Sequence, residues 1–231
     1  MRVNDRYVSF YYEQDDDLGE IKINPEKTAL LVVDMQKVFV VRPDVQEPTE
    51  RDLLEASRWE PFYKRIDEVV TPNNKKLLDA FRERNMNVAF AMIQCQKEDG
   101  SDRSLVQKAT GFNELLLPPG HPDAEIIEEL APIRSEIVVR KTTDSAITGT
   151  SLRLMFHNMG IDTVVVTGVF TDQCVSGTVR SLADESFHVW LIEDACSAAT
   201  EEIQHHELAV LNNIYCHVIN TEELIEALGR S

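Results

Sequence analysis

Three residues with useful chemistry follow three apolar runs of the chain. Asp34 ends "LLVVD", Lys141 ends "IVVRK", and Cys174 closes "GVFTDQC", where a strand-like pattern gives way to a helical one. A carboxylate, an ammonium group and a thiol together supply a base, a cation and a nucleophile. If the three side chains meet in space, the sequence predicts nucleophilic catalysis by a thiol.

Each residue also has an ordinary structural explanation. Asp34 could cap the following helix, Lys141 could be a strand-end charge in water, and Cys174 could be a small buried apolar residue. The combination is more informative, because an adjacent cation and a helix N-terminus lower the pKa of a thiol from its usual ~8.5. We therefore expect a helix that begins near 172–174, whose N–H groups receive a developing oxyanion, with Asp34 taking the thiol proton.

The elements that must position these residues are read from hydrophobic patterning. Short runs rich in valine and isoleucine recur, and they are continuously apolar, as strands buried on both faces of a parallel sheet are. They span 28–34, 87–93, 136–141, 162–168, 188–194 and 216–220. With helical patterns between them, they predict a three-layer α/β/α domain with a six-stranded parallel sheet. Ligands bind such sheets beyond the carboxyl ends of the strands, where the three residues lie.

Three helical patterns can be placed on the sequence. The first, at 73–84, puts Leu77, Leu78 and Phe81 on one stripe; the second, at 151–160, does so with Leu152, Met155 and Phe156 and ends at Gly160. In the third, at 220–229, Asn220 as N-cap would place Glu223 at a capping-box spacing. With Thr221 as the cap, no box forms.

Composition and charge limit the class of protein. Acidic residues outnumber basic ones by 40 to 23, a net charge of −17, so we expect neither nucleic acid nor a membrane as partner. No stretch approaches the ~18 apolar residues of a spanning helix, and the N-terminus has no signal segment. The four cysteines are widely spaced without a CxxC pair, which favours a reducing, cytoplasmic compartment.

The length of 231 residues and the 43% apolar content predict one domain, 1–231, with an N-terminal segment, 1–27. The connection 41–71 is too long for a plain link between a strand and a helix. It carries Trp59, Phe62 and Tyr63, so a lid or interface and an extra surface helix packed by its own aromatics are both open.

The blocks around these residues resemble the isochorismatase-like cysteine hydrolases, a superfamily that includes nicotinamidase, N-carbamoylsarcosine amidase and ureidoacrylate amidohydrolase. The resemblance covers about 28–199. "KTTDSAITGTSL" at 141–152 is similar to the family's K-x-x-x-S-A-F-x-G-T-x-L, with Ile147 in place of Phe. The pattern G-x-x-T-D-x-C-V followed by Thr stands at Gly168, Thr171, Asp172, Cys174, Val175 and Thr178.

The resemblance implies a role for each residue. Asp34 is the general acid and base, Lys141 the cation that stabilises thiolate and intermediate, and Cys174 the nucleophile. It implies a cis peptide bond between Val169 and Phe170, with the N–H groups of Phe170 and Cys174 as oxyanion hole. It also implies the strand order 3-2-1-4-5-6 and a homo-oligomer, a dimer or tetramer. With that order, Lys141 starts from an edge strand and must reach inward over the second strand.

Two departures bear on the reaction. Nicotinamidase-type members hold a metal through an Asp-x-His motif after the second strand, where this chain reads "QCQKEDGSD" at 94–102, so we expect no metal and no cofactor. Isochorismatase itself lacks the nucleophilic cysteine, so Cys174 argues for amide chemistry. We therefore expect a metal-independent amidohydrolase that cleaves a C–N bond of a small amide or carbamoyl compound through a covalent cysteine intermediate.

Some alternatives stay open on the sequence. Phe170 could line the pocket or pack into the next helix, and Cys95 could border the pocket. The chain could be a binding or regulatory protein that keeps the three residues without turnover. A thiol redox protein is disfavoured, because no second cysteine lies near Cys174 in sequence. The residues that bind the substrate are not identified.

Overall fold

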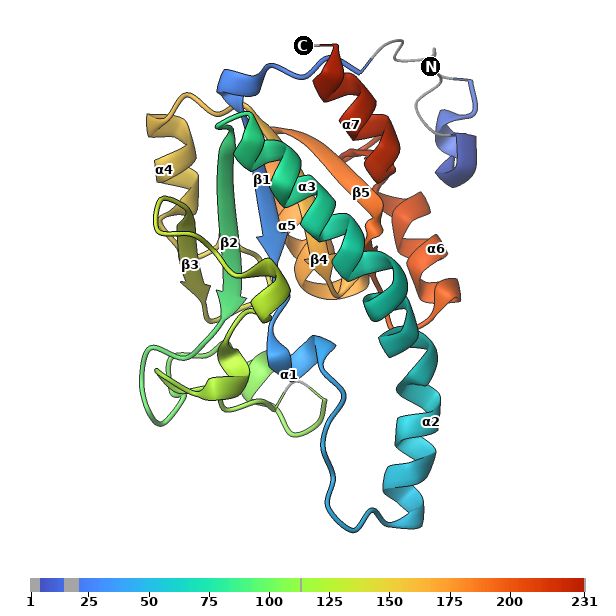
Figure 1. Cartoon of the computed structure of the whole chain (residues 1–231), viewed down its shortest axis with the longest axis vertical. Coiled ribbons are helices and arrows are strands. Elements are labelled where there is room, and N and C mark those ends of the chain that lie inside the picture. The colour runs from blue at the N-terminus through green and yellow to red at the C-terminus, as the bar shows by residue number, and fades with distance from the viewer. Residues whose placement is uncertain (1–4, 15–20, 113, 231) are drawn as a thin grey trace.

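One parallel sheet of six strands organises the molecule, whose computed structural model describes residues 5–14, 21–112 and 114–230 (Figure 1). The strands are β1 (Thr28–Val33), β2 (Asn87–Ile93), β3 (Ile137–Lys141), β4 (Thr163–Val169), β5 (His188–Ser197) and β6 (His217–Ile219). Their order is β3-β2-β1-β4-β5-β6, and every pairing is parallel. The six predicted strands and their order are confirmed.

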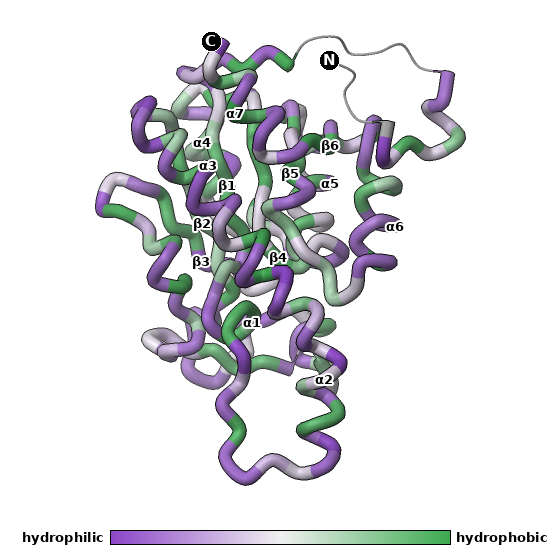
Figure 2. The backbone as a smooth tube through the Cα atoms, turned by 45° about the vertical axis from the view of Figure 1, so that its right-hand side comes forward, coloured by the Kyte–Doolittle hydropathy of each residue, from purple (hydrophilic) through white to green (hydrophobic). Residues whose placement is uncertain are grey.

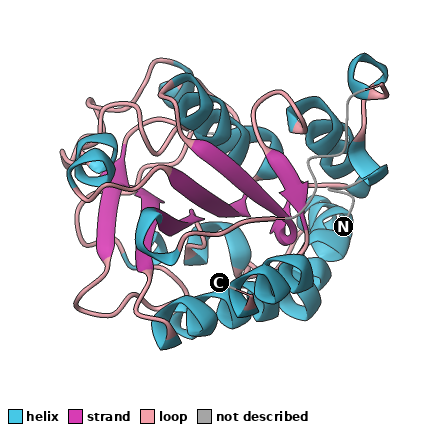
Figure 3. Cartoon of the chain, turned by 90° about the horizontal axis from the view of Figure 1, so that it is seen from above, coloured by secondary structure: helices cyan, strands magenta, loops and turns pink. Residues whose placement is uncertain are grey.

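Helices cover both faces of the sheet (Figure 3). The core is accordingly divided into two clusters, one on each face. One cluster packs the sheet against α3 (Thr71–Glu83) and α7 (Thr221–Gly229). The other packs it against α4 (Leu152–Asn158), α5 (Ser176–Asp184) and α6 (Glu201–Leu211). Figure 2 shows the apolar strands inside and mostly polar residues along the outer helices, as burial of two sheet faces requires.

The predicted helices form, with one error in their buried faces. Leu152 and Phe156 of α4 are fully buried, but Met155 is 38% exposed, so its place on the buried stripe was wrong. A helix of seven residues has too few turns for its periodicity to identify which side of the stripe is buried. At α7 the Asn220 alternative is the correct one, because Asn220 and Glu223 form a reciprocal capping box.

The connection 41–71 contains a helix that extends past the carboxyl ends of the strands. This is α2 (Glu50–Arg65), which begins at a Thr49 capping box and continues through the π-type turn Ile66–Val70 into α3. In Figure 1 α2 extends below the sheet, at the same end of the strands as α1 (Lys37–Val40). Its Phe62 is buried, whereas Leu53 and Leu54 are exposed.

The aromatic N-terminus is divided between burial and exposure. Tyr7 packs against His205 of α6 at 5.1 Å between ring centroids and donates a hydrogen bond to Glu193. Phe10 and Tyr11 are 70% and 73% exposed. No helix within the described residues is long and apolar enough to cross a membrane.

Gly168 is required where β1 and β4 run side by side at the centre of the sheet. It pairs with Val33 and has φ of +114°, a conformation that side chains rarely adopt. A Cβ atom there would lie 1.9 Å from the carbonyl oxygen of Val33. The absence of a side chain lets the two strands that carry Asp34 and Cys174 lie next to each other.

Two buried thiols should make the fold sensitive to alkali. Burial raises the pKa of Cys196 and of Cys216, so the unfolded chain loses these protons first as pH rises. The stability that each thiol contributes is fully present below about pH 8.5, and above that pH the free energy of unfolding falls by about 1.4 kcal/mol per pH unit for each thiol. Urea unfolding between pH 8 and 10 should show that the free energy of unfolding falls less steeply with pH in a C196A/C216A variant than in the wild type. An equal decline in both proteins would contradict this.

Candidate active site

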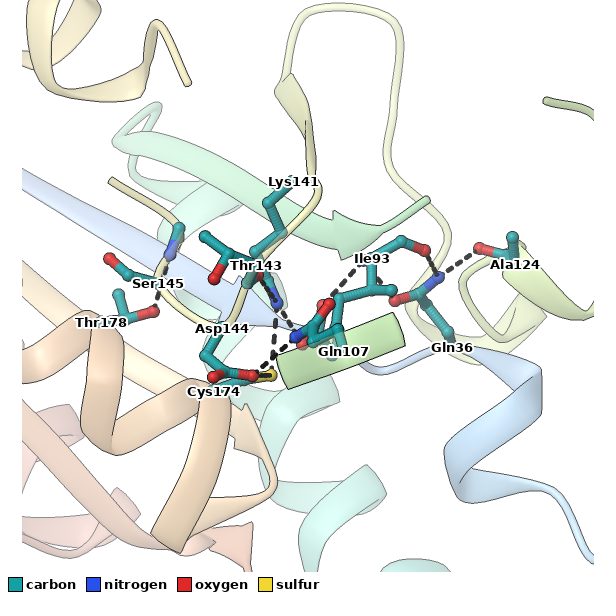
Figure 4. Close-up of polar contacts among 12 residues, drawn as sticks. Gln36, Ile93, Gln107, Ala124, Lys141, Thr143, Asp144, Ser145, Cys174 and Thr178 are labelled. Atoms are coloured by element: carbon teal, nitrogen blue, oxygen red, sulfur yellow. Dashed lines mark hydrogen bonds and ion pairs between the residues drawn. The ribbon is translucent and has the colours of Figure 1, made fainter. Parts of the chain in front are cut away.

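Asp34, Lys141 and Cys174 come together at the carboxyl edge of the sheet. Figure 4 shows the Lys141 and Cys174 side chains meeting there. Lys141 Nζ lies 2.7 Å from Asp34 Oδ2 and 3.3 Å from Cys174 Sγ. The Asp34 carboxylate also acts on the Cys174 thiol, because its charge raises the pKa of that thiol. The second oxygen, Asp34 Oδ1, accepts a hydrogen bond of 3.0 Å from the Ile93 N–H. Carboxylate, ammonium and thiol therefore form one contact group.

Lys141 reaches this group from the edge strand. It ends β3 in register with Ile93 of β2, and its side chain crosses over β2 to Asp34. The side chain is 0% exposed, and Nζ also donates to the Thr143 carbonyl at 3.3 Å. Lys141 is therefore turned inward and not toward solvent.

Burial and mutual charge set the pKa values of the three groups. Burial raises the pKa of Asp34, against the opposing effects of Lys141 and of hydrogen bonds from Cys174 and Ile93. Burial alone would lower the pKa of Lys141, but the negative charges of Asp34 and Cys174 outweigh it and raise that pKa. Burial and the Asp34 charge raise the pKa of Cys174 well above its ordinary value, although Lys141 opposes this.

The direction of the Cys174 shift corrects the sequence-based expectation of a lowered thiol pKa. Lys141 is 2.7 Å from Asp34, so its charge is largely balanced by a carboxylate, and its lowering effect on the pKa of Cys174 is smaller than the raising effects of burial and of Asp34. A proton must leave the sulfur when it reacts, and Asp34 is the adjacent acceptor.

The raised pKa can be measured by alkylation. The rate of iodoacetamide reaction at Cys174, followed by peptide mass spectrometry, should keep rising with pH beyond the ~8.5 midpoint of a free thiol, because only the thiolate reacts. N-acetylcysteine in the same buffers serves as the unperturbed reference. A midpoint below that of the reference would show that Lys141 stabilises a resting thiolate after all.

The segment between β4 and α5 carries the nucleophile loop. The Val169–Phe170 peptide bond is cis. A π-type turn, Thr171–Val175, follows and leads into α5, so the helical run begins slightly earlier than 172–174 and Cys174 lies in its first turn. The N–H groups of Gln173 and Val175 both donate to the Phe170 carbonyl, which anchors the turn to the end of β4.

Two neighbouring cavities lie on the side of the nucleophile, and Cys174 lines the inner one. The inner cavity, of about 10 Å³, is bordered by Asp34, Phe170 and Cys174, and has room for about one water molecule. The outer cavity, which we call the vestibule, has about 430 Å³ and lies against α2. Phe39, Leu115 and Phe170 border both cavities and therefore lie between them.

Of the two roles that the sequence left open for Phe170, the structure supports the one at the pocket, and the ring packs against an earlier helix instead of the next one. It borders both cavities, and its ring also packs against α2, with ring centroids 6.0 Å from Trp59 and 5.1 Å from Phe62. The 41–71 connection contains the helix packed by its own aromatics that the sequence left open, and this helix, α2, also lines the vestibule.

Sequence reasoning missed three polar residues of the site. Gln36 is fully buried and bonds the Ile93 N–H and the carbonyls of Ile93 and Ala124, which holds the end of β2 under Asp34. Gln107 donates 2.7 Å to Asp144, whose Oδ1 lies 3.8 Å from Cys174 Sγ (Figure 4). Asp144, three residues after Lys141, was detectable as a charge beyond a strand end. Gln107 carries no such signal, because it lies in an irregular connection.

Metal ligands and second thiols have no evident place at this site. Within the described ranges, no three His, Cys, Asp or Glu side chains are grouped as metal ligands would be. All four cysteines fall inside those ranges and are free and buried. Cys95 does not border the inner cavity; it lies against the loop at Gly100.

Comparison with known proteins identifies the family of the chain. The sequence model of the Isochorismatase domain matches residues 28–223. The chain belongs to the isochorismatase family. A cysteine hydrolase from Pseudomonas syringae pv. phaseolicola 1448A has a similar structure, with a TM-score of 0.75 and 26% identity over 94% of this chain and 99% of that one.

Curated relatives of this isochorismatase-like hydrolase include both uncharacterised and named proteins. An uncharacterised isochorismatase family protein of Bacillus subtilis (strain 168) is 27% identical over 87% of this chain and 95% of its own length. The ureidoacrylate amidohydrolase of Acinetobacter baylyi is 25% identical over 83% of this chain and 79% of its own. The family expected from the motifs is confirmed.

Proposed function

We propose that this isochorismatase-like hydrolase is a metal-independent cysteine amidohydrolase, which cleaves a C–N bond of a small amide or carbamoyl compound. The observation that carries the proposal is the contact of Lys141 Nζ with Cys174 Sγ at 3.3 Å and with Asp34 Oδ2 at 2.7 Å, which brings the carboxylate and the thiol to one cation. A nucleophile beside a base that is itself held in place is the arrangement of covalent catalysis. The name of the Acinetobacter relative is consistent with this reaction class.

The first half of the reaction forms a covalent intermediate. The Cys174 sulfur attacks the carbonyl carbon while its proton passes to Asp34, which avoids the unfavourable resting thiolate. The carbonyl oxygen becomes an oxyanion, and the backbone N–H groups of Phe170 and Cys174 receive it. The C–N bond then breaks as Asp34 returns the proton to nitrogen, and ammonia leaves. A thioester or a carbamoyl-cysteine remains.

The second half of the reaction restores the thiol. Asp34 takes a proton from water as the water oxygen attacks the acyl carbon, the C–S bond breaks, and Asp34 protonates the departing sulfur. Lys141 stays paired with Asp34 at 2.7 Å throughout and keeps the carboxylate from repelling the developing negative charge. The products are ammonia and an acid, or a carbamate from a ureido substrate.

Ammonia release tests the proposal. Purified protein is incubated with a panel of ureido acids, carbamoyl amino acids, and aryl and aliphatic amides, and the adduct mass on Cys174 is measured after rapid quenching. We expect ammonia from at least one compound and an adduct that matches its acyl or carbamoyl group. Binding of a panel compound without ammonia or adduct would instead support the binding or regulatory protein.

A further inference from the structure

We propose that Asp144 is a second, substrate-binding carboxylate of this site, and that it restricts the enzyme to amides whose substituents are uncharged or positively charged. This inference rests on the proposed amidohydrolase function and names its substrate class. Asp144 Oδ1 lies 3.8 Å from Cys174 Sγ, so any group attached to the attacked carbon comes close to a negative charge. Substrate N–H groups find an acceptor there, and a substrate carboxylate is repelled.

The carboxylate is held in place by a buried chain of hydrogen bonds. Gln107, which is 2% exposed, donates from Nε2 to Asp144 Oδ1 at 2.7 Å. Its Oε1 accepts from Arg103 Nη2 at 3.4 Å, which fixes the orientation of the amide. In this orientation the Gln107 amide donates to Asp144. The Asp144 side chain is therefore held beside the Cys174 sulfur and does not rotate into solvent.

Arg103 is the cation that could have attracted an anionic substrate instead. Its guanidinium donates to the Leu115 carbonyl and to Gln107, so its hydrogen bonds hold the 103–115 connection together. Asp34 and Lys141, which also act on the pKa of Cys174, form an ion pair with each other. Arg103 and Asp144 both line the inner cavity, and it is Asp144 that the structure places 3.8 Å from the sulfur.

The residues that line the vestibule also favour neutral or cationic substrates over anionic ones. Its apolar wall includes Trp59, Phe112 and Phe170, and the Trp59 and Phe112 rings are stacked at 5.7 Å. Its charged residues are Asp52, Glu55, Glu60 and one cation, Arg42, which already binds Glu60 and Asp67. An aromatic or aliphatic group that is neutral or cationic fits this surface, and a carboxylate does not.

Charge-matched alkylation of Cys174 tests this without requiring turnover. Iodoacetamide is a neutral amide and iodoacetate is its anionic counterpart, and peptide mass spectrometry at pH 8.5 measures both rates at Cys174. We expect the ratio of the amide rate to the acetate rate to exceed that of N-acetylcysteine by about tenfold, and Asp144→Asn to remove most of the excess. Asp144→Ser should act in the same way if the asparagine variant folds poorly.

Asp184→Asn is the matched control. It removes the same charge from an exposed position at the far end of α5, so it should leave the ratio unchanged. A wild-type ratio equal to that of N-acetylcysteine, an unchanged ratio in Asp144→Asn, or no reaction of Cys174 with iodoacetamide would each overturn the inference.

Turnover separates the inference from the function on which it rests. The value of kcat/KM is measured for neutral or cationic aryl amides and for ureido acids. Asp144→Asn should lower the ratio of the amide value to the acid value by about tenfold. Amide hydrolysis without any charge preference would overturn the role of Asp144 and leave the amidohydrolase intact. Selective alkylation without hydrolysis of any amide would retain the charge selection and overturn the amidohydrolase.

Discussion

Replacement of Cys174 by alanine is expected to lower amide hydrolysis by about 10⁵-fold or more, while the fold is retained. The loss is large because the sulfur forms the covalent bond, and residues that act as a unit lose nearly all of their combined effect when the nucleophile is removed. The thiol is 5% exposed and replacing it removes a single sulfur atom, so the cost in stability should remain moderate. Single-turnover ammonia release, with circular dichroism for the fold, measures both effects.

Cys216→Ala is the matched control for this variant. Cys216 is also a free, buried thiol, but it precedes β6, next to the sheet edge opposite the one where Lys141 ends. Its replacement should leave kcat/KM within about twofold of the wild-type value. If Cys174→Ala retained more than a few per cent of the activity in a preparation free of other amidases, the covalent mechanism would be wrong.

Replacement of Lys141 by methionine should cost about 3–5 kcal/mol in the free energy of unfolding at neutral pH. Asp34 and Lys141 are 1% and 0% exposed, so the variant leaves an unpaired carboxylate in a dry site. Urea unfolding measures the loss. Activity should fall as well, because a protonated Asp34 cannot accept the proton of Cys174.

The pH dependence of this loss identifies its cause. Lys141 lowers the pKa of Asp34 against the raising effect of burial, so without Lys141 that pKa rises further. A group with a raised folded-state pKa contributes stability that is fully present below its unfolded pKa of ~3.9 and is lost as pH rises through the folded pKa. Lys141→Met should therefore be less destabilised at pH 5 than at pH 8.

The double variant K141M/D34N separates the two causes of the lost stability, the unpaired charge of Asp34 and the altered packing at position 141. With both charges removed, no buried carboxylate is left without a partner, and most of the lost stability should return although activity does not. A double variant as unstable as K141M alone, with no improvement at low pH, would show that packing and not charge is responsible.

The sequence contained enough local information to predict the sheet. Continuous apolar runs alternating with helical stripes admit few solutions besides a parallel sheet covered on both faces, and the six strands were found where these runs stand. The sequence-based prediction of buried faces was wrong in a short helix. Met155 was placed on a buried stripe because α4 has too few turns for its periodicity to identify a face.

The sequence also predicted which residues carry the chemistry, because parallel strands bring their carboxyl ends to one edge whatever the details of packing. It was enough to select Asp34, Lys141 and Cys174 as candidates for one site. The inward path of Lys141 over β2 had to be assumed, and only the structure established it. The same is true of α2, whose position beyond the sheet follows from its aromatic packing against Phe170.

Only the tertiary structure determines how strongly each charged group affects the pKa of the Cys174 thiol. The pKa of Cys174 is raised because burial and the Asp34 charge exceed the influence of a cation already paired, and this balance depends on distances between segments far apart in the chain. The Gln107–Asp144 contact joins two irregular connections in the same way. Sequence periodicity describes each segment by itself. Desolvation and electrostatic pairing belong to their arrangement in space, so these properties appear only in the folded molecule.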